Sequence, residues 1–207
     1  MSFLMKVVVL GDEGVGKRTL INKLIFLRHP KKKLTIDLHW AISGFTTALY
    51  ERKIGLHMIK FQIWILNPLL SKIRRKVLSY GTSGTKKIGE VYCYGALGAI
   101  VLFDITKRQS FTNVQRWIKL VWENNGRGLI PLTIVASKID LREDTIDSIS
   151  SKKGKELAGK FTKHSLTEGF KINYRESSIY DKKMDVGEIF QELGQSYIDF
   201  ITLKQKG

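Results

Sequence analysis

The sequence predicts an α/β fold in which helices cover both faces of a mostly parallel central sheet. Three observations carry this prediction. Short apolar runs alternate with amphipathic stretches, two of the runs are apolar at every position, and a glycine-rich loop joins the first run to a helical segment. Continuous apolar runs are typical of strands in parallel sheets that are buried on both faces. Alternation of strands and helices along the chain indicates the same architecture.

The predicted elements follow one another in this alternating order. Apolar runs predict strands at Val7–Leu10, Leu56–Trp64, Ala99–Phe103 and Leu132–Ala136, and a last strand is expected at Lys171–Arg175. Apolar residues at helical spacing predict helices at Gly16–Phe26, Phe111–Val121, Lys153–Phe161 and Val186–Ile201. Because ligands in such folds bind at the carboxyl ends of the strands, the loops after the strands hold the candidate site.

Composition narrows the class of protein. The 207 residues suit one domain over residues 1–207, and 43% hydrophobic residues exclude disorder as the main state. The single cysteine, Cys93, excludes an intrachain disulfide and a four-thiolate zinc site. A formal net charge of +16 indicates either an anionic partner, such as nucleic acid, a membrane surface or phosphates, or simply a basic solvated surface.

The strongest motif lies between the first predicted strand and the first predicted helix. Gly11 is followed by four residues and then by Gly16 and Lys17. Glycines let successive backbone N–H groups point inward, the helix N-terminus adds its positive end, and the lysine can reach the outer phosphates of a nucleotide. The predicted nucleotide-binding residues of this loop are Glu13, Gly14, Val15, Gly16, Lys17, Arg18 and Thr19.

Arg18 departs from the full motif, which has a serine or threonine whose hydroxyl ligates Mg²⁺. Thr19 cannot simply substitute, because one step along a helix turns the side chain by about 100°. Arg18 either places its guanidinium near the phosphates, in place of the charge of magnesium, or turns outward to solvent. The sequence therefore puts bound Mg²⁺ in doubt.

Two later segments reveal a family resemblance. Ser137–Asp140 follows the fourth strand, and Ser177–Ile179 lies further on. Together with the phosphate loop and Tyr94–Thr106, they resemble, in order, the signals of Ras superfamily small GTPases, nearest the Rab-like members. Ser137–Asp140 is similar to the family's Asn-Lys-x-Asp, and Ser177–Ile179 to its Thr-Ser-Ala. The resemblance covers nearly the whole chain and implies a P-loop NTPase small G domain that binds GTP or GDP.

The resemblance implies a role for each of these residues. Asp140 would accept hydrogen bonds from the guanine N1–H and exocyclic amine, a donor pair that adenine lacks. The stem of Lys138 would lie against the base and ribose, Ile179 would offer its backbone N–H to the guanine carbonyl, and Ser178 would orient Asp140. Ser137 replaces the usual asparagine and is too short for its full role, which includes tying this loop to the phosphate loop. We therefore expect guanine preference with weakened affinity.

Other signals of the family are changed. Ile65 replaces the aspartate that holds magnesium through water, and Pro68, which has no N–H, replaces the glycine that senses the γ-phosphate. Leu69 replaces the glutamine that orients the attacking water. Phosphoryl transfer in these proteins depends on positioning and charge stabilisation. We therefore predict weak or absent intrinsic hydrolysis and assign no catalytic residue, unless a residue elsewhere or a partner substitutes.

The regions that would contact the γ-phosphate are also altered in length. Thr35 and Ser43 are both weak candidates for the threonine that closes over the metal, and it stays open that neither contacts nucleotide. Residues 65–94 form an enlarged second switch, longer than usual by about a dozen residues. Within it, Ser71–Leu78 reads as a short basic amphipathic helix. A small insertion is expected at residues 162–169.

Three functional hypotheses follow. The first is a guanine-nucleotide-binding protein with little or no hydrolysis, acting as a degenerate switch or binding module. The second is an active GTPase with a rearranged or partner-completed site. The third is a nucleotide-free basic scaffold that binds anionic lipid or RNA. The retained Lys17 and Asp140 favour the first hypothesis, and they make nucleic acid the less expected partner.

The excess charge is partly located beside the nucleotide site. The two segments 28–33 and 65–89 contain ten basic residues, which are Arg28, Lys31, Lys32, Lys33, Lys72, Arg74, Arg75, Lys76, Lys86 and Lys87. We therefore expect an effector or regulator protein to bind this basic switch-region surface. Because the final residues carry no cysteine, no lipid anchor is expected. The expected location is cytoplasmic, with peripheral contact at an anionic membrane as a weaker expectation.

Overall fold

The protein is described by a computed structural model, which covers residues 2–28, 45–66, 92–178, 180–181 and 185–205. Its centre is a sheet in the order β2-β3-β1-β4-β5-β6. The strands are β1 (Ser2–Leu10), β2 (Phe45–Ile54), β3 (His57–Leu66), β4 (Gly98–Asp104), β5 (Leu132–Ser137) and β6 (Asn173–Ser177). The pair β2–β3 is antiparallel and the other pairs are parallel, so the prediction of a mostly parallel sheet is confirmed.

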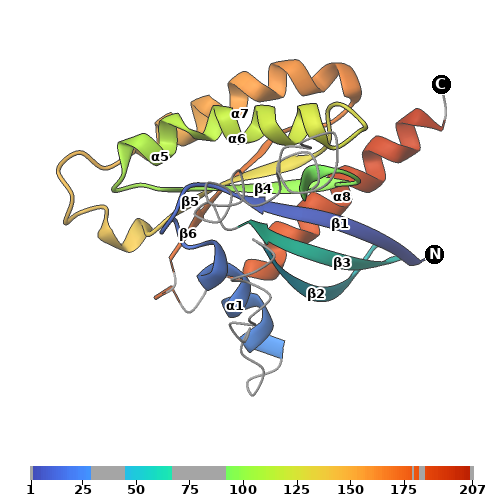
Figure 1. Cartoon of the computed structure of the whole chain (residues 1–207), viewed down its shortest axis with the longest axis horizontal. Helices are drawn as coiled ribbons and strands as arrows, with labels where there is room; N and C mark the ends of the chain where they lie inside the picture. The colour runs from blue at the N-terminus through green and yellow to red at the C-terminus, as the bar shows by residue number, and fades with distance from the viewer. Residues whose placement is uncertain (1, 29–44, 67–91, 179, 182–184, 206–207) are drawn as a thin grey trace, which may run out of the picture.

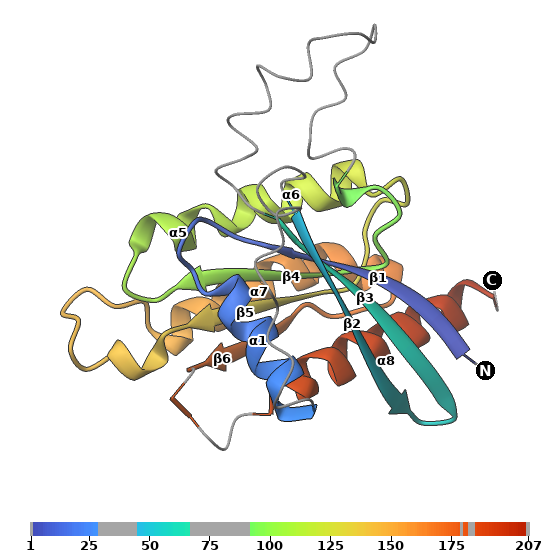
Figure 2. The same cartoon turned by 60° about the horizontal axis from the view of Figure 1, so that its bottom comes forward.

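Helices cover both faces of this sheet, as predicted. They are α1 (Lys17–Arg28), α5 (Arg108–Thr112), α6 (Val114–Asn124), α7 (Ser151–Ser165) and α8 (Val186–Lys204), with 3-10 turns at Ile139–Leu141 and Leu166–Glu168. Figures 1 and 2 show α5, α6 and α7 on one side of the sheet and α1 on the other, with α8 running beneath the strands. Among the described helices, none is long and apolar enough to cross a lipid bilayer.

The strand β1 sends its side chains into two cores. Val8 and Leu10 belong to the core on the α6 and α7 side, whereas Val7 and Val9 belong to the core on the α1 and α8 side. All four side chains are fully buried. Successive side chains of a strand point to opposite faces. This double burial explains why the segment reads as an uninterrupted apolar run.

The sequence did not predict β2, which forms an antiparallel hairpin with β3. Ile54 is the register partner of His57, which leaves a two-residue turn. Gly55 in this turn has a φ of 57°, a conformation that glycine adopts without steric cost. Tyr50 is buried and Leu49 is exposed, which is the alternation of a strand covered on one face. That alternation, followed by a glycine, was the signal available in the sequence.

The helix predicted at Lys153–Phe161 is longer than expected. The Ser150 side chain caps the start of α7 by accepting a hydrogen bond from the Lys153 backbone N–H, and the helix continues to Ser165. Residues 162–169, predicted as a small insertion, therefore form the last turn of α7 and the 3-10 turn that follows it. Gly169 ends this turn with a φ of 86°, a typical helix-terminating conformation.

The predicted enlarged segment at 65–94 is described only at its two ends. Ile65 and Leu66 complete β3, while Tyr92 and Cys93 are buried beside the core. The amphipathic helix predicted at Ser71–Leu78 lies outside the described residues.

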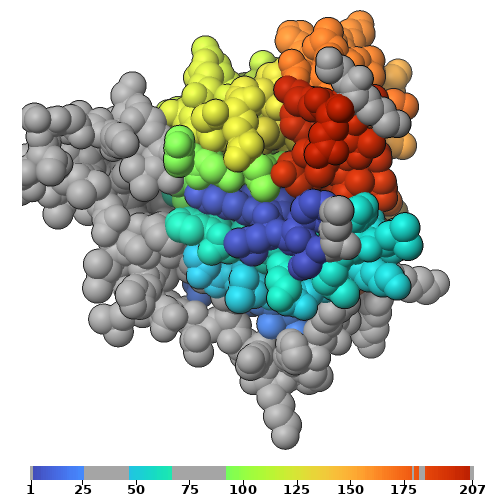
Figure 3. Space-filling model, turned by 90° about the vertical axis from the view of Figure 1, so that its right-hand side faces the viewer, coloured from blue at the N-terminus to red at the C-terminus, as the bar shows by residue number. Residues whose placement is uncertain are grey.

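Figure 3 views the end of the molecule where β1 starts and α8 finishes, which is opposite the carboxyl ends of the parallel strands. Those carboxyl ends hold the candidate site.

Candidate functional site

The phosphate loop has the predicted strand–loop–helix form. It joins the carboxyl end of β1 to the N-terminus of α1. Gly11, Gly14 and Gly16 have φ angles of 133°, 74° and 91°, which glycine adopts readily. A Cβ atom on Gly11 would lie 2.4 Å from the Leu102 backbone oxygen. The loop therefore rests so closely on β4 that only glycine fits there.

Lys17 lies inside this loop. Its Nζ donates hydrogen bonds to the backbone oxygens of Gly11, at 2.8 Å, and Asp12, at 2.6 Å. The side chain is only 7% exposed. Burial lowers the pKa of Lys17 to about 8, although the nearby carboxylates of Asp12 and Glu13 act to raise it. The site therefore holds a cation that is largely shielded from water.

The Asp12 side chain is held by Trp117 of α6 and by Asn113, the residue just before that helix. We call this pair the clamp on Asp12, and the sequence analysis did not predict it. Trp117 Nε1 donates to Asp12 Oδ1 at 2.8 Å, and Asn113 Nδ2 donates to Asp12 Oδ2 at 2.7 Å. The sequence pattern placed Trp117 only on the apolar stripe of its helix. No signal in a single sequence pairs it with a residue about a hundred positions earlier. Two residues outside the phosphate-loop motif therefore hold a side chain of that loop in place.

Ser137 corrects one expectation about the base-recognition loop. We expected this side chain to be too short to tie its loop to the phosphate loop. Its Oγ lies 2.8 Å from the backbone oxygen of Val15 and 2.8 Å from that of Phe103, and it can donate its one proton to either. The tie to the phosphate loop exists because the end of β5 lies close enough for a short hydroxyl to reach.

Lys138 is held by a buried carboxylate that sequence reasoning left without a role. Lys138 has a φ of 61°, and its Nζ lies 2.5 Å from Asp104 Oδ2. Asp104 is fully buried, and its Oδ1 accepts two hydrogen bonds from Thr106. Burial acts to raise the pKa of Asp104, but the hydrogen bonds from Lys138 and Thr106 outweigh it, so that the pKa lies below its usual value. Asp104 therefore fixes the direction of Lys138.

Asp140 and Ser178 lie together, as the resemblance implied. Ser178 Oγ donates to Asp140 Oδ1 at 2.5 Å and accepts a hydrogen bond from the Tyr180 backbone N–H at 3.0 Å. Ser178 is buried, whereas Asp140 lies exposed in the 3-10 turn after β5. The arrangement fixes one carboxylate oxygen and presents the group to solvent. Ile179, also predicted to bind nucleotide, lies outside the described residues.

Sheet register explains why these loops meet. Asp104 of β4 is the register partner of Ser137 of β5, which in turn is the partner of Ser177 of β6. Neighbouring parallel strands thus end at the same level, and the loops after them converge. The phosphate loop joins the group through the Ser137 contact with Val15. The predicted residues from three distant segments therefore lie along one edge of the sheet.

The remaining predicted residues of the phosphate loop differ in exposure. Glu13 and Thr19 are exposed, and Arg18 is partly buried. A further cation, Lys107, lies beside the loop, since a Cβ atom on Gly14 would be 3.5 Å from Lys107 Nζ. This lysine directly precedes α5 and belongs to no motif that the sequence analysis recognised. The loop is thus bordered by more positive charge than its motif predicts.

The two described residues at the expected magnesium positions have side chains without an oxygen ligand. Ile65 is an apolar side chain that is fully buried in the core, and Arg18 offers no oxygen ligand. The remaining predicted candidates, Thr35 and Ser43, lie outside the described residues.

Comparison with known proteins identifies the family. The model of the Ras family matches residues 79–199. The chain is 31% identical over 159 residues to "Ras-related protein RGP2" of Oryza sativa subsp. japonica, covering 77% of this chain and 63% of that protein. It is 32% identical over 168 residues to "Ras-related protein Rab-11A" of Dictyostelium discoideum, covering 80% and 65% respectively. The chain thus spans less than two thirds of the length of these relatives.

Proposed function

Because this chain belongs to the Ras family of small GTPases, we propose that it binds GTP and GDP at the carboxyl edge of its sheet. One observation carries the proposal furthest. Asp140, held by Ser178, lies along the same edge as the loop that surrounds Lys17. Asp140 would recognise the base and Lys17 the phosphates, on one edge of the sheet. A purely structural loop does not need that combination.

The phosphate loop suits the anionic end of the ligand. Its glycines let backbone N–H groups turn inward, and the N-terminus of α1 adds a partial positive charge. Lys17 would exchange its hydrogen bonds to loop carbonyls for bonds to phosphate oxygens, which carry more charge. Lys107, beside Gly14, adds a second cation at the border of the loop.

The other end of the site suits guanine. One oxygen of Asp140 is occupied by Ser178, and an ionised carboxylate has further acceptor capacity on both of its oxygens. It can therefore accept hydrogen bonds from the guanine N1–H and the exocyclic amine. Lys138 is held by Asp104 in a position from which its aliphatic stem can cover the base. Adenine presents no matching donor pair, so the site discriminates against it.

We further propose that intrinsic GTP hydrolysis is weak or absent, and that the protein acts as a degenerate switch or binding module. Four changes support this proposal, at Arg18, Ile65, Pro68 and Leu69. The Ile65 side chain faces the core and leaves no carboxylate at the end of β3. We propose in addition that nucleotide binding depends less on Mg²⁺ than on the cations Lys17 and Lys107, because Arg18 and Ile65 offer the metal no oxygen ligand.

The proposed partner is an effector or regulator protein that binds the basic switch-region surface, residues 28–33 and 65–89. The support is compositional, since these two segments contain ten basic residues and no acidic ones. We propose a cytoplasmic location, with peripheral contact at an anionic membrane through the same charges. Binding to negatively charged vesicles that falls with rising salt would test the membrane part.

The decisive experiment identifies the nucleotide that the protein carries. The purified chain is denatured with and without prior EDTA treatment, and the released ligand is analysed by chromatography. We expect GDP or GTP in both samples. Absence of nucleotide, together with no uptake of added GDP or GTP, would overturn the proposal of guanine-nucleotide binding. Nucleotide that is lost on EDTA treatment would overturn the proposed independence from Mg²⁺.

Hydrolysis is tested separately by single turnover of GTP in the presence of Mg²⁺. We expect no phosphate release above the rate of the Lys17→Ala variant. Release many times faster than that of Lys17→Ala would overturn the proposal of weak or absent hydrolysis and favour an active enzyme with a rearranged site. Because binding and turnover are measured independently, failure of one proposal leaves the other standing.

A further inference from the structure

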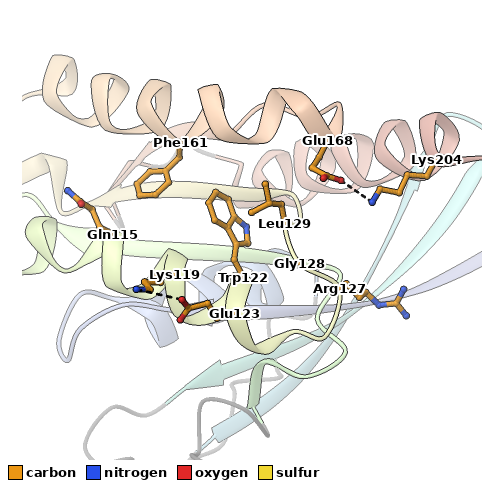
Figure 4. A pocket seen from close by; sticks show the side chains of 10 residues that line it. All are labelled: Gln115, Lys119, Trp122, Glu123, Arg127, Gly128, Leu129, Phe161, Glu168 and Lys204. Atoms are coloured by element: carbon orange, nitrogen blue, oxygen red, sulfur yellow. Dashed lines mark ion pairs between the residues drawn. The ribbon is translucent and has the colours of Figure 1, made fainter. Parts of the chain in front are cut away.

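A second candidate binding site lies on the side of the molecule formed by α6 and α7. It is an open groove with a cavity volume of about 640 Å³, lined by residues of α6, α7, the end of α8 and the loop after α6. Figure 4 shows Trp122 of α6 and Phe161 of α7 pointing toward each other, with Leu129 beside them. None of these residues belongs to the nucleotide site described above.

The floor of the groove offers aromatic surface and little else. The rings of Trp122 and Phe161 are 5.7 Å apart and meet edge to face. Trp122 Nε1 donates to the backbone oxygen of Ile130 at 3.1 Å, so the indole has no further donor to give a ligand. Aromatic rings favour other aromatic groups in offset or edge-to-face contact. The floor therefore suits a bulky apolar side chain.

The loop that forms one wall is fixed from within. Asn125 is 1% exposed and donates through Nδ2 to the Gly128 backbone oxygen at 2.7 Å. Its Oδ1 accepts a hydrogen bond from the Arg127 backbone N–H, also at 2.7 Å. A wall held by a buried amide does not have to be ordered by a ligand. The groove is therefore formed before any partner arrives.

The lining of the groove has a small excess of positive charge, with Lys119, Arg127 and Lys204 against Glu123 and Glu168. Its two carboxylates are already paired, Glu123 with Lys119 at 3.6 Å and Glu168 with Lys204 at 2.9 Å. Arg127 lies at one end of the groove (Figure 4). Arg127 is exposed and forms no ion pair within the described part of the chain, so it is the lining cation that remains for an acidic ligand.

We propose that this groove binds an acidic peptide segment of a partner protein. An aromatic side chain of the peptide packs on Trp122 and Phe161, and a neighbouring carboxylate of the peptide faces Arg127. A peptide fits better than an acyl chain, because polar groups close both ends of the apolar floor, with Gln115 at one end and the Glu168–Lys204 pair toward the other (Figure 4). One large side chain flanked by charges matches that pattern.

The proposal goes beyond nucleotide binding and does not rest on it. The test uses a short synthetic peptide of aspartate and glutamate with a central phenylalanine, and a matched peptide with a central serine. Binding to the full chain is followed through the ¹⁵N indole signals of its tryptophans, and is repeated with Lys17→Ala. We expect the phenylalanine peptide to bind about tenfold more tightly, to shift the Trp122 signal most and to bind Lys17→Ala equally well.

Charge reversal supplies the second measurement. Arg127→Glu at the end of the groove is expected to weaken the phenylalanine peptide about threefold or more, whereas Lys60→Glu, an exposed matched change on β3, leaves its affinity unchanged. Equal affinity for the two peptides, equal effects of the two variants, or shifts that spare Trp122 would each overturn the proposal. So would adsorption to vesicles containing phosphatidylserine without any response to peptide, which would make the face a membrane contact.

Discussion

The carboxyl ends of the strands differ sharply across the sheet. After β4, β5 and β6, three polar contacts join different segments: Asp104 holds Lys138, Ser178 holds Asp140, and Ser137 contacts the loop at Val15. At the end of β3, by contrast, Ile65 is an apolar side chain that is fully buried. One side of the edge is built as a polar site and the other as part of the core.

The difference supports the proposal that nucleotide binding and hydrolysis are carried by separable parts of the fold. The proposed base and phosphate recognition would depend on partly buried hydrogen bonds, whose loss would leave polar groups without partners inside the protein. At the end of β3, where a magnesium-binding aspartate is expected, Ile65 packs in the core instead. On this proposal, a chain can lose the metal site without disturbing the binding contacts. The predictions below test this separation, from the largest expected effect to the smallest.

Lys17→Ala should have the largest effect. It removes the buried cation of the phosphate loop, and we expect affinity for GDP to fall by about 100-fold or more, because charge-assisted hydrogen bonds to phosphate are lost. Equilibrium titration with a fluorescent GDP analogue measures the change. Lys60→Ala on β3 is the matched control. An affinity within twofold of the parent would show that the loop does not bind phosphate.

Asp140→Ala should remove the preference for guanine. GTP binding is expected to weaken by about tenfold or more, since the hydrogen bonds from the base to a charged group are lost. Inosine triphosphate lacks the exocyclic amine, so it should bind the parent less tightly than GTP but bind the variant equally well. Competition titrations measure both ratios. Asp144→Ala, an exposed change nearby, should preserve the parent's preference, and its loss there would implicate the loop in general.

Alkaline pH should weaken nucleotide binding through Lys17. Burial sets the pKa of this lysine at about 8 in the free protein, and a bound phosphate stabilises the protonated form. Affinity should therefore be constant below the free pKa and fall above it, by up to about tenfold per pH unit. Titrations of GDP between pH 7 and 9 measure the slope. The same slope in Lys17→Ala would assign the titration to another group.

Trp117→Phe should give the smallest effect. It removes one hydrogen bond to Asp12 but keeps an apolar ring, and we expect release of GDP to become about threefold to tenfold faster. Stopped-flow displacement of a labelled nucleotide measures the rate. The thermal midpoint is read beside it, so that a general loss of stability is recognised. Unchanged release would show that Asn113 alone is sufficient to hold the carboxylate.

The sequence revealed the parts of this molecule that are determined locally. The apolar run at Val7–Leu10 and the stripe of α8 arise from burial along one element, so their pattern is visible in one stretch of chain. The hairpin strand β2 was missed because polar Thr and Arg side chains interrupt its alternation of apolar and polar residues, so that it has no continuous apolar run. The phosphate loop and the segment Ser137–Asp140 were recognised because each is a short motif of neighbouring residues.

Contacts between distant segments could not be predicted in the same way. The clamp on Asp12, the hold of Asp104 on Lys138 and the reach of Ser137 to Val15 depend on how strand ends align in three dimensions. Ser137 illustrates the limit, since its side chain alone looked too short. Side-chain length decides nothing until the distance between backbones is known, and the register of β4 and β5 determines that distance.

The clamp on Asp12 also has a consequence for the energetics of binding. A glycine-rich loop has more conformational freedom to lose than other segments, and a ligand that had to order it would bind more weakly by that amount. Here Trp117 and Asn113 restrict the loop by holding the carboxylate of Asp12, a group that the glycines of the loop do not have. The ordering entropy is therefore lost during folding. A nucleotide would meet a loop already in shape, and its association would resemble docking into a rigid receptor more than coupled folding.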